Sequence, residues 1–550
     1  MTDHPLDTDV PLATARTAYA RGDWDRAVRE YSRIHAAEGL ALEDLDRLGS
    51  SLWWVGETAE SLVISEDVYH RYEDSGEDAR AAMKALKLGL LWFIRGDQVI
   101  ASGWASRARR NLAVLPESAE HGFLLYLDAA VAFSEGDTGP ARDAVVPLEE
   151  LGRRVHAPPL QALSLVLAGM VDLVEARTVT GFAKLDEAML PVLAGQLDPE
   201  WAGDVYCTVI HACHRLADVP RMRSWTRATE QWCRQFQGEV VYTGICRVHR
   251  LQLMCAEGHW GEAEEAIERC GAELVGTNNW VAGEAYYQLG EIRRLRGDHA
   301  AAVAAFGRAR DLGTDPQPGE ALLQHADGLT EAAWSGLCSA LAGRDRLAAA
   351  SLLGAGVGLA LALGKGEEAE YLCAELEATA EGFGSPGFRA WAAHARAALL
   401  VAEGHYGEAI PVLEGVAADY RTLRLRYESA GVQELLSRAF EGLGDAGAAA
   451  THRSRALATY RELGAAPDIA RLDAAERLRV GVSRAGAPGG LTGREVEVLR
   501  QIAGGASNRA AAEELFISQK TVGRHLANIF TKIGVSSRTA AAAWAHEHGL

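Results

Sequence analysis

The sequence predicts an all-α protein, in which a long array of helical hairpins is followed by a small four-helix domain. Glycine turn signals recur about every forty residues over the first 463 residues, with helical stretches between them. The last sixty residues, 491–550, hold four short helical patterns, each with its own capping residue. With 550 residues, 48% hydrophobic and 24% charged, the composition is that of a folded chain with several domains or one long repeat array.

The array is predicted from a turn signal, glycine followed by a polar residue. It occurs at Gly22, Gly56, Gly96, Gly136, Gly258, Gly297, Gly343, Gly364, Gly404 and Gly444. Five residues after each of them stands alanine, except for Ser61 after Gly56, and such small residues let the second helix of a hairpin cross the first closely. One hairpin cannot bury its own apolar face, so we expect neighbouring hairpins to stack into a superhelix.

Two irregularities interrupt the period. Between Gly136 and Gly258 lie 122 residues, and we expect two junctions without glycine there, near Thr178 and Asp218. After Gly343 the next turn signal follows only 21 residues later, which breaks the register.

The clearest repeat unit covers residues 286–316. It carries Tyr286, Leu289-Gly290, Gly297-Asp298, Ala302, Phe306, Ala309 and Pro316. This pattern resembles the tetratricopeptide repeat, although the units here are longer than the usual ~34 residues. The resemblance implies a tetratricopeptide-like α-solenoid over residues 1–463.

Residues 464–490 are predicted to connect the array to the last domain. Apolar and charged residues alternate with helical spacing over 467–480, which indicates one more amphipathic helix. The following residues, 481–490, contain four glycines and a proline, and we expect them to form a flexible linker.

The first two helices of residues 491–550 are predicted from their caps. Thr492 and Glu495 have the spacing of a capping box, and apolar residues repeat behind them until Gly504-Gly505. Ser507 can cap the second helix. A fourth, alanine-rich helix is expected to start at Ser536 or Ser537.

The third helix begins after Ser518 and ends at Gly534. Its apolar stripe faces inward, whereas its other face carries Gln519, Lys520, Thr521, Arg524 and Asn528. Two short helices joined by a tight turn, the second with a polar and basic outer face, suit insertion into the major groove of DNA, with the motif at about 506–525. The same pattern alone also fits a small helical bundle with ordinary surface charges.

A resemblance favours DNA binding. Residues 491–550 are similar to the LuxR-type helix-turn-helix domain, through Leu491-Thr492, Arg494-Glu495, Glu497-Val498-Leu499, Ala503, Gly505, Ser507-Asn508, Ala512, Leu515, Ile517-Ser518, Thr521-Val522, His525, Asn528-Ile529, Lys532, Val535 and Arg538. The resemblance implies a recognition helix at about 518–533 and a fourth helix that helps two domains to pair. With it, we assign DNA contacts to Ser507, Asn508, Arg509, Ser518, Gln519, Lys520, Thr521, Gly523, Arg524, Asn528 and Lys532. We assign dimerisation to Arg538, Ala541, Trp544 and Ala545.

The segment departs from the family at two places. Ala510-Ala511 stands where the family usually has Glu-Ile, which thins the packing of the second helix. Gly523 stands where a lysine is usual, and a glycine inside a helix costs about 1 kcal/mol relative to alanine. The second departure puts the affinity for DNA in doubt, but not the fold.

The net charge and the cysteine content indicate which part of the chain binds DNA and in which compartment the protein is found. The net charge is −20, and residues 491–550 contribute seven Lys/Arg and five Asp/Glu, or +2, so the remaining residues carry −22. An acidic body repels DNA, so DNA binding should be confined to the small domain. Eight cysteines without a CxxC pair, an acidic N-terminus and no apolar run long enough for a membrane span predict a cytoplasmic protein.

The sequence gives weaker signals for a nucleotide-binding or metal-binding site. Gly364-Lys365 lacks the earlier glycine of a phosphate-binding loop, and the repeats begin by residue 13, so neither an ATPase domain nor a cofactor is predicted. Cys207, His211 and His214 share one helical face and offer ligands for zinc or haem iron. We favour buried cysteines with two groove histidines, because no second ligand pair with zinc spacing follows.

These observations predict a transcriptional regulator and not an enzyme. Its array, which resembles those of large LuxR-type regulators without their ATPase domain, would sense a peptide, a protein or a small molecule and control pairing of the C-terminal domain on double-stranded DNA as a homodimer. RNA polymerase is another expected partner, and a membrane is not. The alternative is a protein-interaction scaffold with a degenerate DNA-binding domain, which Gly523 favours.

Overall fold

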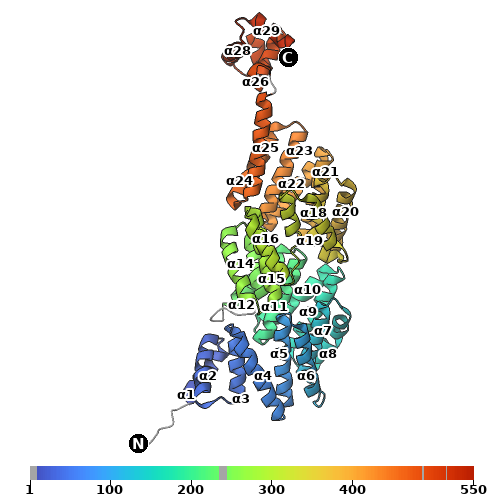
Figure 1. Cartoon of the computed structure of the whole chain (residues 1–550). Coiled ribbons are helices and arrows are strands. Elements are labelled where there is room, and N and C mark those ends of the chain that lie inside the picture. Colours follow the sequence, from blue (N-terminus) through green and yellow to red (C-terminus); the bar gives the residue numbers. More distant parts are fainter. Residues whose placement is uncertain (1–8, 235–243, 486–487, 516) are drawn as a thin grey trace, which may run out of the picture. The chain divides into compact units, whose positions relative to one another are not determined.

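The computed structural model describes residues 9–234, 244–485, 488–515 and 517–550, and it divides into two compact units, Met1–Gly464 and Ala465–Leu550. All regular elements within the described ranges are helices (Figure 1), which confirms the all-α prediction. None of the helices in these ranges combines the length and the apolar content that a bilayer span requires.

The first unit is built from helical hairpins, each formed by an odd-numbered helix and the even-numbered helix that follows it. The helices of the first half are α1 (Asp9–Ala20), α2 (Trp24–Glu38), α3 (Leu42–Trp54), α4 (Thr58–Asp74), α5 (Asp78–Ile94), α6 (Gln98–Leu112), α7 (Ala119–Ser134), α8 (Gly139–Arg154), α9 (Pro158–Val174), α10 (Thr178–Leu193), α11 (Pro199–Arg215) and α12 (Val219–Cys233). Those of the second half are α13 (Gly244–Ala256), α14 (Trp260–Leu274), α15 (Asn279–Arg296), α16 (His299–Asp311), α17 (Gly319–Ala326), α18 (Thr330–Leu341), α19 (Arg346–Ala362), α20 (Gly366–Phe383), α21 (Pro386–Ala402), α22 (Tyr406–Leu423), α23 (Arg426–Gly442) and α24 (Ala446–Leu463).

The turn glycines behave as the period predicts. All ten adopt positive φ, between 68° and 95°, a conformation in which a β-carbon would clash with its own backbone. Nine of the ten small residues that follow five positions later are no more than 2% exposed, at the crossing of the two helices. The two expected junctions without glycine are also present, because Ala176 (φ 60°) and Ala217 (φ 50°) make the turns α9–α10 and α11–α12.

Gly343 was assigned to the wrong kind of turn. It lies between two hairpins, after α18, and Ala348 behind it is partly exposed. The hairpin turn of this unit is Gly328 (φ 82°), and Ala333, five residues on, is fully buried. The sequence pattern missed Gly328 because an apolar residue, Leu329, follows it. With Gly328 in place, the steps from Gly297 to Gly364 are 31 and 36 residues, and the break in register disappears.

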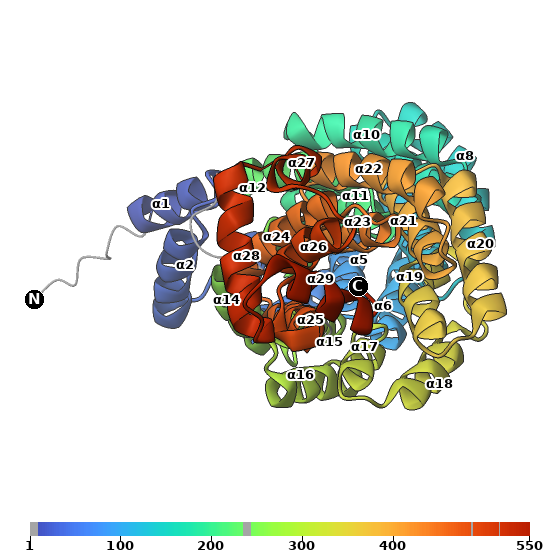
Figure 2. The ribbon, with the colours of Figure 1, turned by 90° about the horizontal axis from the view of Figure 1, so that it is seen from above.

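The hairpins of the first unit wind around a common axis. Seen along this axis, second helices such as α10, α16, α18 and α20 lie at the outer rim, and first helices such as α11, α15 and α19 lie nearer the axis (Figure 2). Hydrogen bonds connect residues 186 and 170 positions apart: Trp280 Nε1 donates to the Ile94 carbonyl oxygen at 3.1 Å, and the Gly387 amide donates to the Ala217 carbonyl oxygen at 3.2 Å. Successive turns of the superhelix therefore touch each other.

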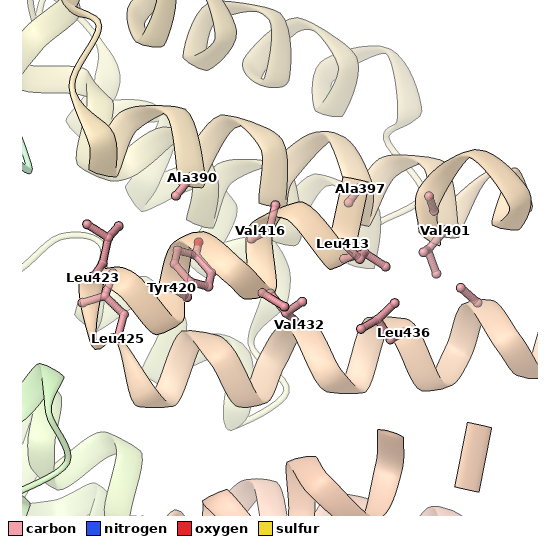
Figure 3. Close-up of a cluster of buried hydrophobic side chains, with 13 residues drawn as sticks. Ala390, Ala397, Val401, Leu413, Val416, Tyr420, Leu423, Leu425, Val432 and Leu436 are labelled. Carbon is pink, nitrogen blue, oxygen red and sulfur yellow. The ribbon is translucent and has the colours of Figure 1, made fainter. Parts of the chain in front are cut away.

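The core of each hairpin is shared with its neighbours. Between α21, α22 and α23, for example, Ala397, Leu413 and Val432 are fully buried against one another (Figure 3). Truncating a leucine in such a core costs about 2–5 kcal/mol. The cluster ends at Tyr420 and Leu425, beside the link between α22 and α23.

The second unit begins with α25 (Ala466–Ala485), which runs five residues beyond the helix predicted for 467–480. The predicted flexible linker, 481–490, is therefore helical over its first half, and residues 486 and 487 lie outside the described ranges. A single glycine at 481 costs a helix only about 1 kcal/mol, and the flanking residues are ordinary helix formers. The rest of the unit consists of a 3₁₀ turn at Pro488–Gly490 and of α26 (Gly493–Ala503), α27 (Asn508–Glu514), α28 (Gln519–Ile533) and α29 (Arg538–Glu547).

Gly489 is a structural residue of the second unit. Its φ is 69°, and a β-carbon on it would lie 2.8 Å from Ile533 Cγ2 and 2.9 Å from Trp544 Cζ2. The 3₁₀ turn thus packs closely on α28 and α29, which only glycine allows. This part of the predicted linker belongs to the folded domain.

Candidate nucleic-acid interface

The helix expected to recognise DNA, α28, has a serine cap at its start and a glycine at its end. Ser518 Oγ accepts a hydrogen bond from the Thr521 amide at 3.1 Å, and Gly534 ends the helix with φ 71°. Its inner stripe, Val522, Leu526 and Ile529, is no more than 7% exposed. The inner stripe holds the helix on the domain core and turns its other face to solvent.

The outer face of α28 carries the predicted polar set. Gln519, Lys520, Arg524 and Asn528 are exposed, and no hydrogen bond or ion pair within the described residues occupies their side chains. Gly523 lies on the same side of the helix, and a β-carbon placed on it would meet nothing within 4 Å. The two cations and two amides are therefore available to a ligand.

Thr521 and Ser518 bond to each other at the start of α28. Their hydroxyl oxygens lie 2.7 Å apart, and Ser518 also caps the helix. These two residues, both predicted to contact DNA, shape the first turn of the helix. Helix N-termini bind phosphate oxygens with their free amides, so this turn can still face a phosphate.

Lys532 was predicted to contact DNA, but it has a partner inside the domain. Its Nζ lies 2.6 Å from Glu495 Oε2, and Glu495 is only 3% exposed. Glu495 also completes the predicted capping box, accepting from the Thr492 amide at 2.8 Å. Burial alone would raise the pKa of Glu495, but the hydrogen bonds from Lys532 and Thr492 outweigh it and hold the pKa below its usual value. Lys532 is thus a structural cation that joins α28 to α26.

The start of α27 is held by the domain itself. Ser507 Oγ caps the helix by accepting from the Ala510 amide at 3.1 Å. Asn508 Oδ1 accepts from Arg538 Nη1 at 2.7 Å, and Arg538 also donates to the Ala506 carbonyl oxygen. Of the three residues predicted here to contact DNA, Ser507 and Arg509 are exposed, and Arg509 forms an ion pair with Glu513 within α27.

The residues assigned to dimerisation need correction. Ala541 and Ala545 are 0% exposed in the core of their own domain, and Arg538 is engaged with α27. Trp544 is partly buried, stacked on His548 with ring centroids 4.0 Å apart. The two alanines of this set lie on the inner face of α29. The exposed face holds Thr539, Ala543, His546 and Glu547 instead.

Two residues of α13 lie beside the candidate metal site formed by Cys207, His211 and His214. Cys207 Sγ lies 3.4 Å from Cys246 Sγ, and His211 Nδ1 lies 3.3 Å from His249 Nε2. The His214 ring lies beside that of His249, with the centroids 4.6 Å apart and the ring planes tilted by 33°. Sequence spacing cannot reveal Cys246 and His249 as neighbours, because the packing of α13 on α11 brings them there. Even so, in the ranges that the structure describes, no three such side chains are placed to hold one metal ion.

The histidines of this cluster are core residues. Burial lowers the pKa of His211 to about 3 and that of His214 to about 4, and it also depresses the pKa of His249 well below its usual value. All three imidazoles are therefore neutral at pH 7. They pack as flat, weakly polar rings between first helices of neighbouring hairpins.

Comparison with known proteins bears on the second unit. Residues 490–545 match the family model of bacterial regulatory proteins, luxR family. The C-terminal domain is a LuxR-family helix-turn-helix domain. Its segment is 52% identical over 60 residues to the transcriptional regulatory protein LiaR of Bacillus subtilis and 50% identical over 58 residues to the CsgBAC operon transcriptional regulatory protein of Escherichia coli. These matches cover 11% and 10% of this chain, and 28% and 27% of the relatives, respectively.

Solved structures similar to most of the chain share little sequence identity with it. One is the hetero-tetramer Cut9-Hcn1 of the APC/C, with 13% identity and a TM-score of 0.38, covering 85% of this chain and 96% of that one. Another is a Rap protein complexed with Competence and Sporulation Factor, with 10% identity and a TM-score of 0.36, covering 74% of this chain and 99% of that one. In this chain the LuxR-family domain follows an array of stacked helical hairpins.

Proposed function

We propose that the protein is a transcriptional regulator that binds double-stranded DNA through α28 of its LuxR-family domain. The observation that supports this most is the outer face of α28, where Lys520, Arg524, Gln519 and Asn528 stand exposed in a domain matched to this family. Arginine can bond a guanine edge or a phosphate, and lysine a phosphate. The proposal places the protein with the chromosome in the cytoplasm.

Pairing of two chains would follow the symmetry of a two-fold operator. The exposed face of α29, with Thr539, Ala543 and His546 spaced by four and three residues, is the surface we assign to it. Small and polar residues along one stripe let two helices approach closely. In this proposal the array senses a ligand or partner and thereby shifts the population of chains able to pair on DNA.

The test is genome-wide mapping of the DNA bound by the protein, followed by affinity measurements on a mapped site. Arg524→Ala should weaken binding about tenfold or more, since a charge-assisted contact contributes about 1–3 kcal/mol. Arg500→Gln is the matched control, because Arg500 is an exposed arginine of α26 that is not among the predicted DNA contacts. Equal losses in the two variants would contradict the assignment of α28 as the recognition helix.

A second candidate function is a protein-interaction scaffold whose domain no longer binds DNA. The observation that favours it is Gly523, which leaves the middle of the outer face without a side chain. The mapping experiment separates the two, because a scaffold would give no enriched sites that depend on Arg524.

A further inference from the structure

Arg424 has an unusual backbone conformation for a residue with a side chain. It links α22 to α23 with φ 58°, whereas the corresponding links after α20 and α24 use Gly384 (φ 63°) and Gly464 (φ 78°). A β-carbon in this left-handed region is strained, and such strain concentrates at functional sites. An arginine here, in place of the glycine used elsewhere, therefore calls for a role for its side chain.

The Arg424 side chain lines a cavity of about 420 Å³ in the first unit. The cavity lies between the α22–α23 link and the turn between α13 and α14. Its other lining residues are Glu257, His259, Tyr420, Arg421, Leu425, Arg426, Ser429 and Thr459. Figure 3 shows Tyr420 and Leu425 at one end of the buried cluster, which anchors this wall.

A second cavity of about 310 Å³ adjoins the first and shares Arg421 and Ser429 with it. It is lined also by Gln433, His452 and Arg455. We call the two cavities together the arginine groove. Its two lobes meet at Arg421.

The charges of the arginine groove are not balanced by its own carboxylates. Four arginines line it, against the two carboxylates Glu257 and Glu414, which leaves +2. This local excess contrasts with the net charge of −22 that residues 1–490 carry. Positive charge in a concave site surrounded by an acidic surface selects for small anions that can enter it.

Two of the arginines have no carboxylate partner among the described residues. Arg421 Nε donates only to the Ala417 carbonyl oxygen of its own helix, at 3.1 Å, and Arg455 makes no ion pair. Arg424 shares Glu257 with Arg223: Arg424 Nη1 lies 3.4 Å from Glu257 Oε1, and Arg223 Nε lies 3.0 Å from it. Arg426 pairs with Glu462. The guanidinium groups of Arg421 and Arg455 thus remain available to a ligand, and Arg424 is bound only through a shared carboxylate.

Neutral donors complete the site. The hydroxyl groups of Ser429 and Thr459 and the ring of His259 line the first lobe, and His452 lines the second. The N-terminus of α23 opens on the first lobe, and Leu425 at its N-cap supplies no side-chain acceptor for the amides of the first turn. Glu428 in this turn accepts a hydrogen bond from its own backbone amide, and the helix dipole at this end favours an anion.

We propose that the arginine groove binds a small molecule that carries two phosphate groups, one in each lobe. Arginine and phosphate form paired, bidentate hydrogen bonds, and four arginines with two hydroxyls match the many acceptor oxygens of two phosphates. Arg421, where the lobes meet, bridges both groups. The site does not depend on whether the array controls DNA binding.

The test is calorimetric titration of the full-length protein with inorganic pyrophosphate at constant ionic strength. We expect saturable binding with one site per chain and an affinity at least about tenfold lower for Arg424→Gly, because one charge-assisted contact is lost. Arg424→Gly relieves the left-handed strain, so its thermal midpoint should equal or exceed that of the parent. The matched control is Arg389→Gln, an exposed arginine of α21 outside the groove, which should bind as the parent does.

Each other outcome contradicts the proposal. Absence of pyrophosphate binding, or equal affinity in Arg424→Gly and the parent, would remove the site. Tighter binding of succinate than of pyrophosphate would assign the groove to dicarboxylates, and binding of only a phosphoserine peptide would assign it to a protein partner. No DNA is present in these titrations, so their failure leaves the proposed function untouched.

Discussion

Replacing Gly523 by lysine should strengthen DNA binding if α28 enters the major groove as proposed. The substitution fits without steric cost, because the space around a β-carbon at this position is empty to 4 Å. It restores a cation on the outer face of α28, between Lys520 and Arg524. One new phosphate contact contributes about 1–2 kcal/mol, from which like-charge repulsion by Lys520 three residues away removes a few tenths.

The net expectation is an affinity increase of about five- to tenfold on a mapped operator. The salt dependence should change as well, with log K falling more steeply by about 0.9 per unit of log salt concentration, because one more counterion is released. Both quantities can be measured by fluorescence anisotropy at four or five salt concentrations.

Gly523→Ala is the matched control for this substitution. It gains helix propensity, worth about 1 kcal/mol in the stability of the domain, without adding a charge. Its denaturation midpoint should therefore rise like that of Gly523→Lys, whereas its salt slope should stay at the parent value. If the lysine and alanine variants bind with the same affinity and the same slope, position 523 does not face DNA and the recognition face has been placed wrongly.

Two further predictions follow from the second unit and from charge. In urea denaturation, Lys532→Met should destabilise the C-terminal domain by about 1–2 kcal/mol, since it leaves the buried Glu495 carboxylate without an ion-pair partner. Arg509→Gln breaks an exposed ion pair and should change the stability by under about 0.5 kcal/mol. Because the pKa of Glu495 is depressed in the folded domain, this stabilisation is fully present above the pKa of glutamate in the unfolded chain and is lost as the pH falls through the pKa of Glu495 in the folded domain. Lys532→Met should therefore reduce the loss of stability at acid pH. An unchanged dependence of stability on pH would refute the pairing. Residues 484–550 should bind an operator about tenfold more tightly than the full-length protein at equal dimer concentration, because the charge of −22 on residues 1–490 repels the DNA phosphates. Equal affinities would instead make the array a docking platform for a partner such as RNA polymerase.

Local signals in the sequence predicted the elements and their ends. The Thr492–Glu495 capping box, the serine caps of the later helices and the left-handed turn glycines all act within a few residues, so the sequence alone reveals them. The turns at Ala176 and Ala217 were also located, because the period of the neighbouring units left room for them.

What the sequence could not show depends on contacts between distant helices. Which alanines of α29 face inward depends on the position of α26, so the resemblance to the family could not show that Ala541 and Ala545 are buried in their own domain. Lys532 resembled a DNA contact because its partner Glu495 lies 37 residues away. The arginine groove brings together residues from 257 to 459, and no spacing rule relates them.

The contacts between superhelical turns have a consequence for how the array responds to damage. In a simple solenoid each repeat touches only its neighbours, so the chain can fray from an end one unit at a time. Here the bonds from Trp280 to Ile94 and from Gly387 to Ala217 tie hairpins several repeats apart. Melting one of these hairpins therefore also exposes the hairpin bonded to it, and we expect the array to unfold in blocks larger than a single hairpin. A perturbation at one of these hairpins therefore reaches a hairpin 170 or 186 residues away through a direct contact.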